Sequence, residues 1–304
     1  MKLKFNVTGM NQPDPFIFRD DDGKFYIYTT GVGGVQGYSA DSLTDEWKYE
    51  GTVFNVPHGY EYWAPSVIKL DGKYYMYVSF CIHSDGEFMH VAVADRPLGP
   101  FGDVKRLYNR FTIDSHVVQT SAGLFLWYAE NNVNCDRVGT RVFVDKLIDP
   151  YTPANICKEV VVPTLDEEIS VIKDTGPWHT IEGAFWFREG EWQYVMYSGG
   201  AFRNDTYHIG YAAAKSDEED LTKVDFVKFT DNGKFCPTMF RNDVEEGVGH
   251  HSVIKVDGQY YAIYHGRDLG DGAREEFAEA RTARVCKLHV KDGTITAERY
   301  PDRV

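Results

Sequence analysis

The chain has 304 residues and a formal net charge of −14 at pH 7, with no run of Lys or Arg that offsets it. This charge disfavours nucleic acid and anionic membrane surfaces as partners, because both are themselves negatively charged. The sequence begins without the apolar segment of a signal peptide, and no apolar run is long enough to span a bilayer. Its five cysteines are scattered and odd in number, which is typical of reduced thiols, so we expect a cytoplasmic protein.

One sequence pattern occurs five times along the chain. Each copy is a short apolar run, a turn that contains glycine, and a second run rich in aromatic residues. In chain order the copies are residues 14–28, 64–77, 114–127, 182–197 and 250–264. Asp71-Gly72 and Asp257-Gly258 are strong hairpin signals, because tight hairpin turns need positive φ and glycine adopts it at little cost. Each copy is therefore predicted to be a hairpin of two antiparallel strands.

The sequence between the copies leaves room for two more strands after each hairpin. The turn glycines are Gly23, Gly72, Gly123, Gly190 and Gly258, and short candidate strands follow at residues 37–40, 91–94 and 210–213. Helical periodicity is weak, and only residues 216–224 and 273–283 are mildly compatible with a helix.

Four antiparallel strands per unit, repeated radially, make a β-propeller. We therefore expect an all-β fold, a five-bladed β-propeller with four antiparallel strands per blade. A β-sandwich with coincidental hairpins is the alternative, which five copies with the same internal order disfavour. No domain boundary is visible, so residues 1–304 are predicted to form a single domain.

Polar residues recur at one position of the repeat, just before the first strand of the hairpin. In a propeller this strand lines the central axis, so its start lies at one mouth of the channel. The position carries Asp14, Asp114, Glu182 and His250 in the first, third, fourth and fifth copies. Where carboxyl groups converge, repulsion between their negative charges raises the pKa of at least one of them. General acid–base catalysis needs such a pair, one carboxyl protonated and another ionised.

Glycoside hydrolysis uses two carboxyl groups in this way. In inverting enzymes they stand about 6.5–9.5 Å apart, which leaves room for the attacking water. Taken singly, each of these acids would be interpreted as a strand-start residue that caps a turn. Their shared position in the repeat favours a catalytic role.

Five stretches resemble the motifs of glycoside hydrolase family 43, whose members are five-bladed propellers. They are residues 11–16, 62–67, 113–117, 181–185 and 249–253, and the resemblance extends from Gln12 to Tyr300. It implies that Asp14 is the general base, that Glu182 is the general acid, and that Asp114 tunes the pKa of the acid and orients it. The chain departs from the family pattern at Ala184 and at Ser115-His116, but neither departure removes a charged group.

The resemblance also implies which residues surround the sugar. Arg281 resembles an arginine of the last blade that reaches the terminal sugar, and Arg267 is the competing candidate. Trp63 either stacks on the sugar or wedges between blades one and two, and Phe16 of the first motif is a further candidate for substrate binding. His250 resembles a histidine near the axis that helps to hold a calcium ion, so one structural calcium ion and no other cofactor is expected.

These observations predict a single catalytic domain that acts as an inverting glycoside hydrolase. It would release terminal α-L-arabinofuranose or β-D-xylose from arabinan- or xylan-derived oligosaccharides, its expected partners. One alternative is a fructosidase-like hydrolase, which residues 12–15 and Gly183 disfavour, or a glycoside phosphorylase, which would need a basic phosphate site. The other is a non-catalytic sugar-binding propeller, which would be expected to lack one of the axial carboxylates. The sequence does not indicate the oligomeric state.

Overall fold

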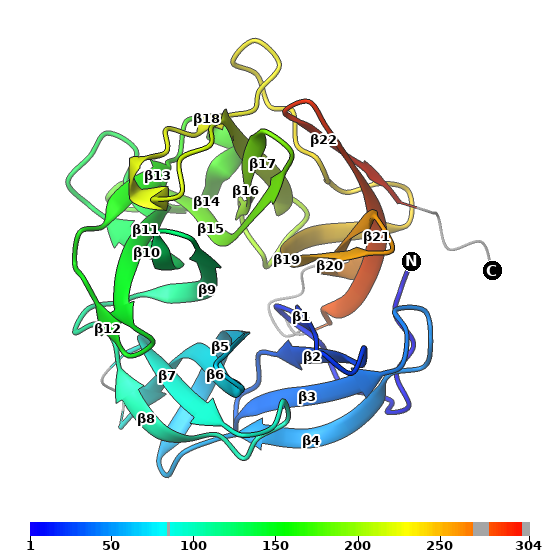
Figure 1. The fold of residues 1–304 in the computed structure, drawn as a ribbon. Coiled ribbons are helices and arrows are strands. Elements are labelled where there is room, and N and C mark those ends of the chain that lie inside the picture. The colour runs from blue at the N-terminus through cyan, green and yellow to red at the C-terminus, as the bar shows by residue number, and fades with distance from the viewer. Residues whose placement is uncertain (84–85, 270–279, 300–304) are drawn as a thin grey trace.

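The computed structural model of the chain consists almost entirely of β-strands, which confirms the predicted all-β class (Figure 1). It describes residues 1–83, 86–269 and 280–299. Within these ranges the helical elements are two 3-10 turns, η1 (Asp166–Glu168) and η2 (Leu221–Lys223). The second lies in one helix-compatible stretch, whereas residues 273–279 of the other lie outside the described residues. None of the described segments forms a helix with the length and hydropathy that a membrane span requires.

Three sheets contain four antiparallel strands each, in chain order. The first contains β1 (Phe16–Arg19), β2 (Phe25–Thr29), β3 (Val35–Ala40) and β4 (Lys48–Phe54). The second contains β5 (Gly59–Leu70), β6 (Lys73–Ile82), β7 (Phe88–Ala94) and β8 (Gly102–Arg106). The third contains β19 (Glu245–Val256), β20 (Gln259–Asp268), β21 (Thr282–Lys291) and β22 (Thr294–Glu298).

The remaining strands form one ten-stranded sheet, where the sequence predicts two separate units. They are β9 (Ile113–Thr120), β10 (Gly123–Asn132), β11 (Gly139–Asp149), β12 (Thr152–Pro153), β13 (Lys158–Val161), β14 (Ile169–Lys173), β15 (Gly176–Glu189), β16 (Trp192–Gly199), β17 (His208–Lys215) and β18 (Val227–Lys228). The two halves are joined where β11 runs parallel to β15, through the residue pairs Gly139–His179 and Thr140–Thr180. A Cβ atom on Gly139 would lie 1.9 Å from the His179 carbonyl oxygen, so this close approach requires glycine.

All five predicted hairpins are present, as β1–β2, β5–β6, β9–β10, β15–β16 and β19–β20. Each of their turn glycines has positive φ. Asp71 and Asp257, which precede two of these glycines, have φ of 49° and 50°. Two successive residues with positive φ form a type I′ turn, whose twist matches that of the flanking strands.

The hairpin units are arranged in a ring, with the first strand of each unit innermost (Figure 1). Buried apolar side chains of the described residues form five clusters, each between two consecutive units. Tyr28 and Met76 pack between the first two units, for example, and Ile27 and Ile263 pack between the first unit and the last. The core is therefore a series of layers between neighbouring units.

The N-terminal segment lies between the last unit and the first. The Val285 N–H donates to the Met1 carbonyl at 2.7 Å, and the Leu3 N–H donates to the Ala283 carbonyl at 3.0 Å. On the other side, the Trp47 N–H donates to the Lys4 carbonyl at 2.7 Å. The segment thus links the two ends of the ring through backbone hydrogen bonds as well as through side-chain packing.

We predict that Leu3→Ala lowers the free energy of unfolding by about 2–4 kcal/mol, because it leaves a cavity in the cluster that closes the ring. Urea unfolding followed by tryptophan fluorescence measures this change. Ile148→Ala is the matched control: its side chain is 72% exposed, so we expect a change within about 0.5 kcal/mol. Equal effects of the two substitutions would contradict a role of Leu3 in ring closure.

Candidate active site

Each hairpin unit holds one residue beside the axis in the left-handed backbone conformation. The φ angles are 53° at Asp14, 45° at Ala64, 62° at Asp114, 61° at Gly183 and 38° at His250. In the last four units the strand pairing is irregular at the same place. Residues other than glycine rarely adopt positive φ, and β-bulges redirect side chains. The repeated irregularity therefore turns one residue of each unit towards a common centre.

In the fourth unit this residue is Gly183, so Glu182 lies one place earlier than its predicted position in the repeat. The Gly183 N–H donates to Asp114 Oδ2 at 2.9 Å, which ties the third unit to the backbone beside Glu182. The structure thus brings the two carboxyl groups together, although they do not occupy equivalent positions.

At the irregular strand starts, some backbone N–H groups do not pair with the neighbouring strand. Side chains from elsewhere in the chain accept hydrogen bonds from them instead. The N–H of Asp14 donates to His265 Nδ1 at 3.1 Å, that of Ala64 to Thr30 Oγ at 2.8 Å, and that of His250 to Ser198 Oγ at 2.8 Å. Buried N–H groups need such acceptors. The sequence reasoning missed Thr30, Ser198 and His265, although each lies in the C-terminal part of the second strand of its hairpin or directly after it.

A cavity of about 630 Å³ opens over this end of the axis. Its lining includes six of the predicted site residues: Asp14, Trp63, Asp114, Glu182, His250 and Arg281. Thr30, Ile113, Phe202, Arg203 and Tyr207 also line the cavity and were not predicted. Several of these come from connections outside the repeated hairpins, where sequence periodicity gives no signal.

Asp14 is surrounded by hydrogen-bond donors and cationic groups. Arg281 Nη1 donates to its Oδ1 at 3.2 Å, and Thr30 Oγ donates to its Oδ2 at 2.6 Å. His250 Nδ1 lies 3.5 Å from Oδ1. Burial alone would raise the pKa of Asp14, but Arg281, His250 and His265 together outweigh it and hold the pKa well below its usual range. Asp14 is therefore ionised.

The pKa values of Asp114 and Glu182 are raised, in contrast to that of Asp14. Burial, and then the charge of Asp14, raise the pKa of Asp114 to about 8. Burial, and then the charge of Asp114, raise the pKa of Glu182 to about 8, although a hydrogen bond from Tyr207 lowers it in part. Because these groups interact, their protons titrate as a property of the pair. The site therefore holds one ionised carboxyl beside a pair that keeps a proton at neutral pH.

Two residues predicted to bind substrate lie outside this cavity. Arg267 is fully buried, and its guanidinium donates to the carbonyls of Phe202 and Asn204, both at 2.7 Å, so it anchors the loop that carries Phe202. Phe16 lies deeper, beside His116 and Phe185, and lines only a narrow space beneath the carboxyl groups. Of the two arginines that the sequence left open, Arg281 reaches the cavity.

The axis offers poor ligands for the expected calcium ion. Calcium takes six to eight oxygen ligands. The narrow space at the axis has a volume of only about 10 Å³, and although Asp14 and Asp114 border it, much of its lining is Phe16, Phe185 and histidine rings. The described residues contain no group of three or more His, Cys, Asp or Glu side chains arranged to hold a metal. His250 Nδ1 instead faces Asp14 and Asp114, at 3.5 and 3.8 Å. These residues do not fit the ion.

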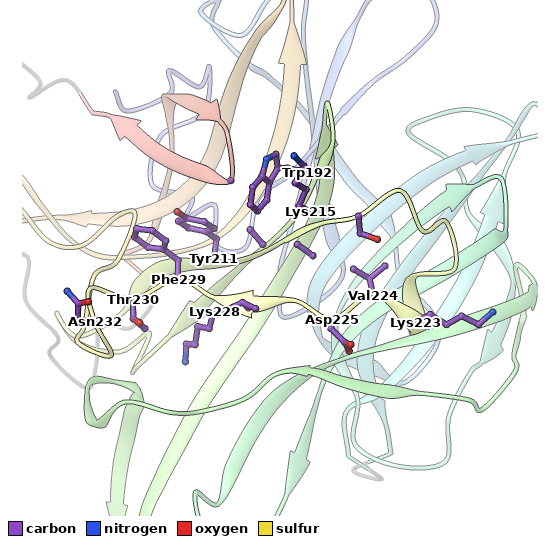
Figure 2. A pocket seen from close by; sticks show the side chains of 15 residues that line it. Trp192, Tyr211, Lys215, Lys223, Val224, Asp225, Lys228, Phe229, Thr230 and Asn232 are labelled. Carbon is purple, nitrogen blue, oxygen red and sulfur yellow. The ribbon is translucent and has the colours of Figure 1, made fainter.

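A larger cavity, of about 880 Å³, lies on the outer flank of the ring along β17 and β18 (Figure 2). Trp192, Tyr211 and Phe229 form its aromatic part. Asp225 is the one carboxylate among its lining residues, and it is exposed and paired with Lys158 at 2.6 Å. A single exposed acid lacks the paired, buried carboxyl groups that acid–base catalysis requires.

Comparison with known proteins places the chain among carbohydrate-active enzymes. The model of the glycosyl hydrolases family 43 matches residues 6–295. An extracellular exo-alpha-(1->5)-L-arabinofuranosidase of Streptomyces avermitilis is 25% identical over 98% of the chain and 67% of its own length. A xylosidase/arabinosidase of Bacteroides ovatus is 24% identical, with 96% of each chain covered.

Solved structures show the same fold. A thermostable family-43 glycoside hydrolase superposes with a TM-score of 0.82 at 22% identity, covering 98% of this chain and 95% of the other. An alpha-L-arabinofuranosidase from Lactobacillus brevis gives a TM-score of 0.78 at 18% identity, covering 96% and 95%. Since the family model covers nearly the whole sequence, the chain belongs to glycosyl hydrolase family 43 and is a glycoside hydrolase.

Proposed function

We propose that the protein is an exo-acting, inverting glycosidase that releases terminal α-L-arabinofuranose or β-D-xylose from arabinan- or xylan-derived oligosaccharides. The observation that carries the proposal is the set of three carboxyl groups in one cavity, with Asp14 held ionised and with the pKa of Asp114 and Glu182 raised. A base that is ionised and an acid that is protonated at the same pH are what an inverting glycosidase needs.

In this mechanism Asp14 acts on water and Glu182 acts on the leaving group. Asp14 accepts a proton from a water molecule as the water oxygen bonds to the anomeric carbon. Glu182 donates its proton to the glycosidic oxygen as the bond between that oxygen and the anomeric carbon breaks. Asp114 acts through its electrostatic coupling to Glu182, which keeps a proton on the pair at neutral pH, and through its hydrogen bond from the Gly183 N–H. Exchange of protons with solvent then restores both groups.

The substrate class rests on the relatives and on the cavity lining. Relatives are named exo-arabinofuranosidase, xylosidase/arabinosidase and, in Aspergillus flavus, a probable arabinan endo-1,5-alpha-L-arabinosidase. In the cavity, the half-buried Trp63 donates its indole N–H to Glu61 at 2.8 Å, which fixes its ring at the wall. A fixed aromatic ring beside polar groups suits a sugar, which has apolar faces and hydroxyl edges.

We further propose that the ring is a five-bladed propeller with four strands per blade. On this interpretation the ten-stranded sheet contains the third and fourth blades, linked by the short parallel contact between β11 and β15. The five core clusters between consecutive hairpin units support it. A cytoplasmic location remains a prediction; no step above depends on it or on a calcium ion, which the residues at the axis do not fit.

We predict that Asp14→Asn and Glu182→Gln each lower kcat/KM by roughly 10²–10⁴-fold on arabino- or xylo-oligosaccharides, because each removes one proton-transfer group. Product analysis with a panel of both oligosaccharide types measures the rates and separates terminal from internal cleavage. Asp225→Asn, in the flank cavity, is the matched control and should keep wild-type activity. Full activity of Glu182→Gln would refute its assignment as the acid.

We predict that the product first appears with the anomeric configuration opposite to that of the substrate. In the proposed step a single displacement by water inverts the anomeric carbon. Proton NMR of the reaction in its first minutes distinguishes the two anomers before mutarotation equilibrates them. Retention of configuration would mean that a carboxylate attacks the sugar, and it would exclude the role given to Asp14.

The pH dependence of kcat/KM should show a wide plateau that ends near pH 8. The acid must be protonated, so activity is lost as the pH rises through the raised pKa of the Asp114–Glu182 pair. On the acid side Asp14 stays ionised to below its usual range, so activity should persist there. Asp114→Asn removes a charge that raises the pKa of Glu182, and should therefore move the alkaline limb to lower pH. An unchanged limb in that variant would contradict the coupling.

A further inference from the structure

We propose that Tyr207 is the positioning residue of the catalytic acid: it holds one carboxyl oxygen of Glu182 and leaves the other to carry the transferred proton. This inference rests on the proposed function and assigns a part to a residue that the repeat pattern does not reveal. Tyr207 directly precedes β17 and lines the same cavity as Glu182.

The contact between the two side chains is short, and its donor is buried. The Tyr207 hydroxyl donates to Glu182 Oε1 at 2.7 Å, and the tyrosine side chain is 1% exposed. In the part of the chain that the structure describes, no other hydrogen bond reaches the Glu182 carboxyl. The orientation of the acid therefore depends on this one donor.

The ring of Tyr207 is itself fixed on two sides. A Cβ atom on Gly249 would lie 1.9 Å from Tyr207 Cε1, so the backbone of β19 packs directly against the ring. The ring also stacks on His265, with centroids 5.6 Å apart and planes 10° apart. His265 in turn accepts a hydrogen bond from the Asp14 N–H. Through Tyr207, the orientation of the acid is thus connected to the strand start that carries the base.

The position of the acid proton follows from the protonation of the phenol. Burial, and then the charge of Glu182, raise the pKa of Tyr207 well above its usual value, so the hydroxyl remains a donor across the working range. With Oε1 accepting that hydrogen bond, the carboxyl proton lies on Oε2. Transfer breaks the Oε2–H bond and forms a bond from the proton to the glycosidic oxygen. The carboxylate that results keeps its hydrogen bond from Tyr207.

We predict that Tyr207→Phe lowers kcat roughly 10- to 100-fold on an arabino- or xylo-oligosaccharide, with little change in KM. On a dinitrophenyl pentoside the loss should stay within about threefold, because a good leaving group needs little protonation. The alkaline limb should move to higher pH, since the hydrogen bond that lowers the pKa of Glu182 is lost. Steady-state kinetics with both substrates across the pH range measure all three.

Tyr77→Phe is the matched control, because it removes an equally buried hydroxyl that donates to the Pro150 carbonyl, away from the cavity. It should leave both rates unchanged. If Tyr207→Phe fails to fold, Gly249→Ala tests the same point by displacing the ring. It should show the same dependence on the leaving group. Equal losses on the two substrates, or wild-type rates in Tyr207→Phe, would overturn the inference.

Glu182→Gln, assayed on the same substrates, separates this inference from the function on which it rests. If Glu182→Gln is inactive on the oligosaccharide while Tyr207→Phe matches the wild type, Glu182 is the acid and Tyr207 does not position it. If Glu182→Gln keeps wild-type activity, the assignment of the acid is itself wrong, and the inference about Tyr207 falls with it.

Discussion

Three carboxyl groups gathered at one end of the ring favour a shared proton over three charges, and the site depends on how their unequal neighbours divide them. Asp14 has Arg281, His250 and Thr30 within contact distance, and it stays ionised. Asp114 accepts a hydrogen bond from a neutral amide, and Glu182 accepts one from a phenol. Since neutral donors offset burial less than cations do, the proton remains with this pair. The unequal surroundings of like groups thus separate a base from an acid.

This convergence requires a strained backbone at the start of the inner strands. A residue other than glycine in the left-handed conformation costs about 1–2 kcal/mol, and Asp14, Ala64, Asp114 and His250 all adopt it. Such conformations persist where the surrounding structure overdetermines them. Here the layers of core between the units, and side-chain acceptors such as Thr30 and Ser198, supply that restraint. The fold thus holds the strand starts in place, and the strand starts orient the carboxyl groups towards the cavity.

The sequence predicted the parts of the molecule that repeat. The hairpins, their glycine turns and the convergence of Asp14, Asp114 and Glu182 follow from one recurring pattern, and the structure contains them. Tyr207 was missed because it lies in a connection, and Phe16 was misplaced because the irregular strand start turns Asp14 to the cavity and leaves Phe16 below it. Arg267 was a reasonable candidate by position, but burial and two carbonyl acceptors show that it holds a loop.

Chemistry and specificity therefore come from different parts of the chain. The floor of the cavity consists of strand starts, whose geometry the ring fixes. The walls come from connections, including the loop of Phe202 and Arg203 that Arg267 anchors from below. Phe202 also packs under the guanidinium of Arg281, 4.8 Å from ring centre to Cζ. A change in that loop alters the shape around the sugar and the position of Arg281, while the proton-transfer groups remain on the strands.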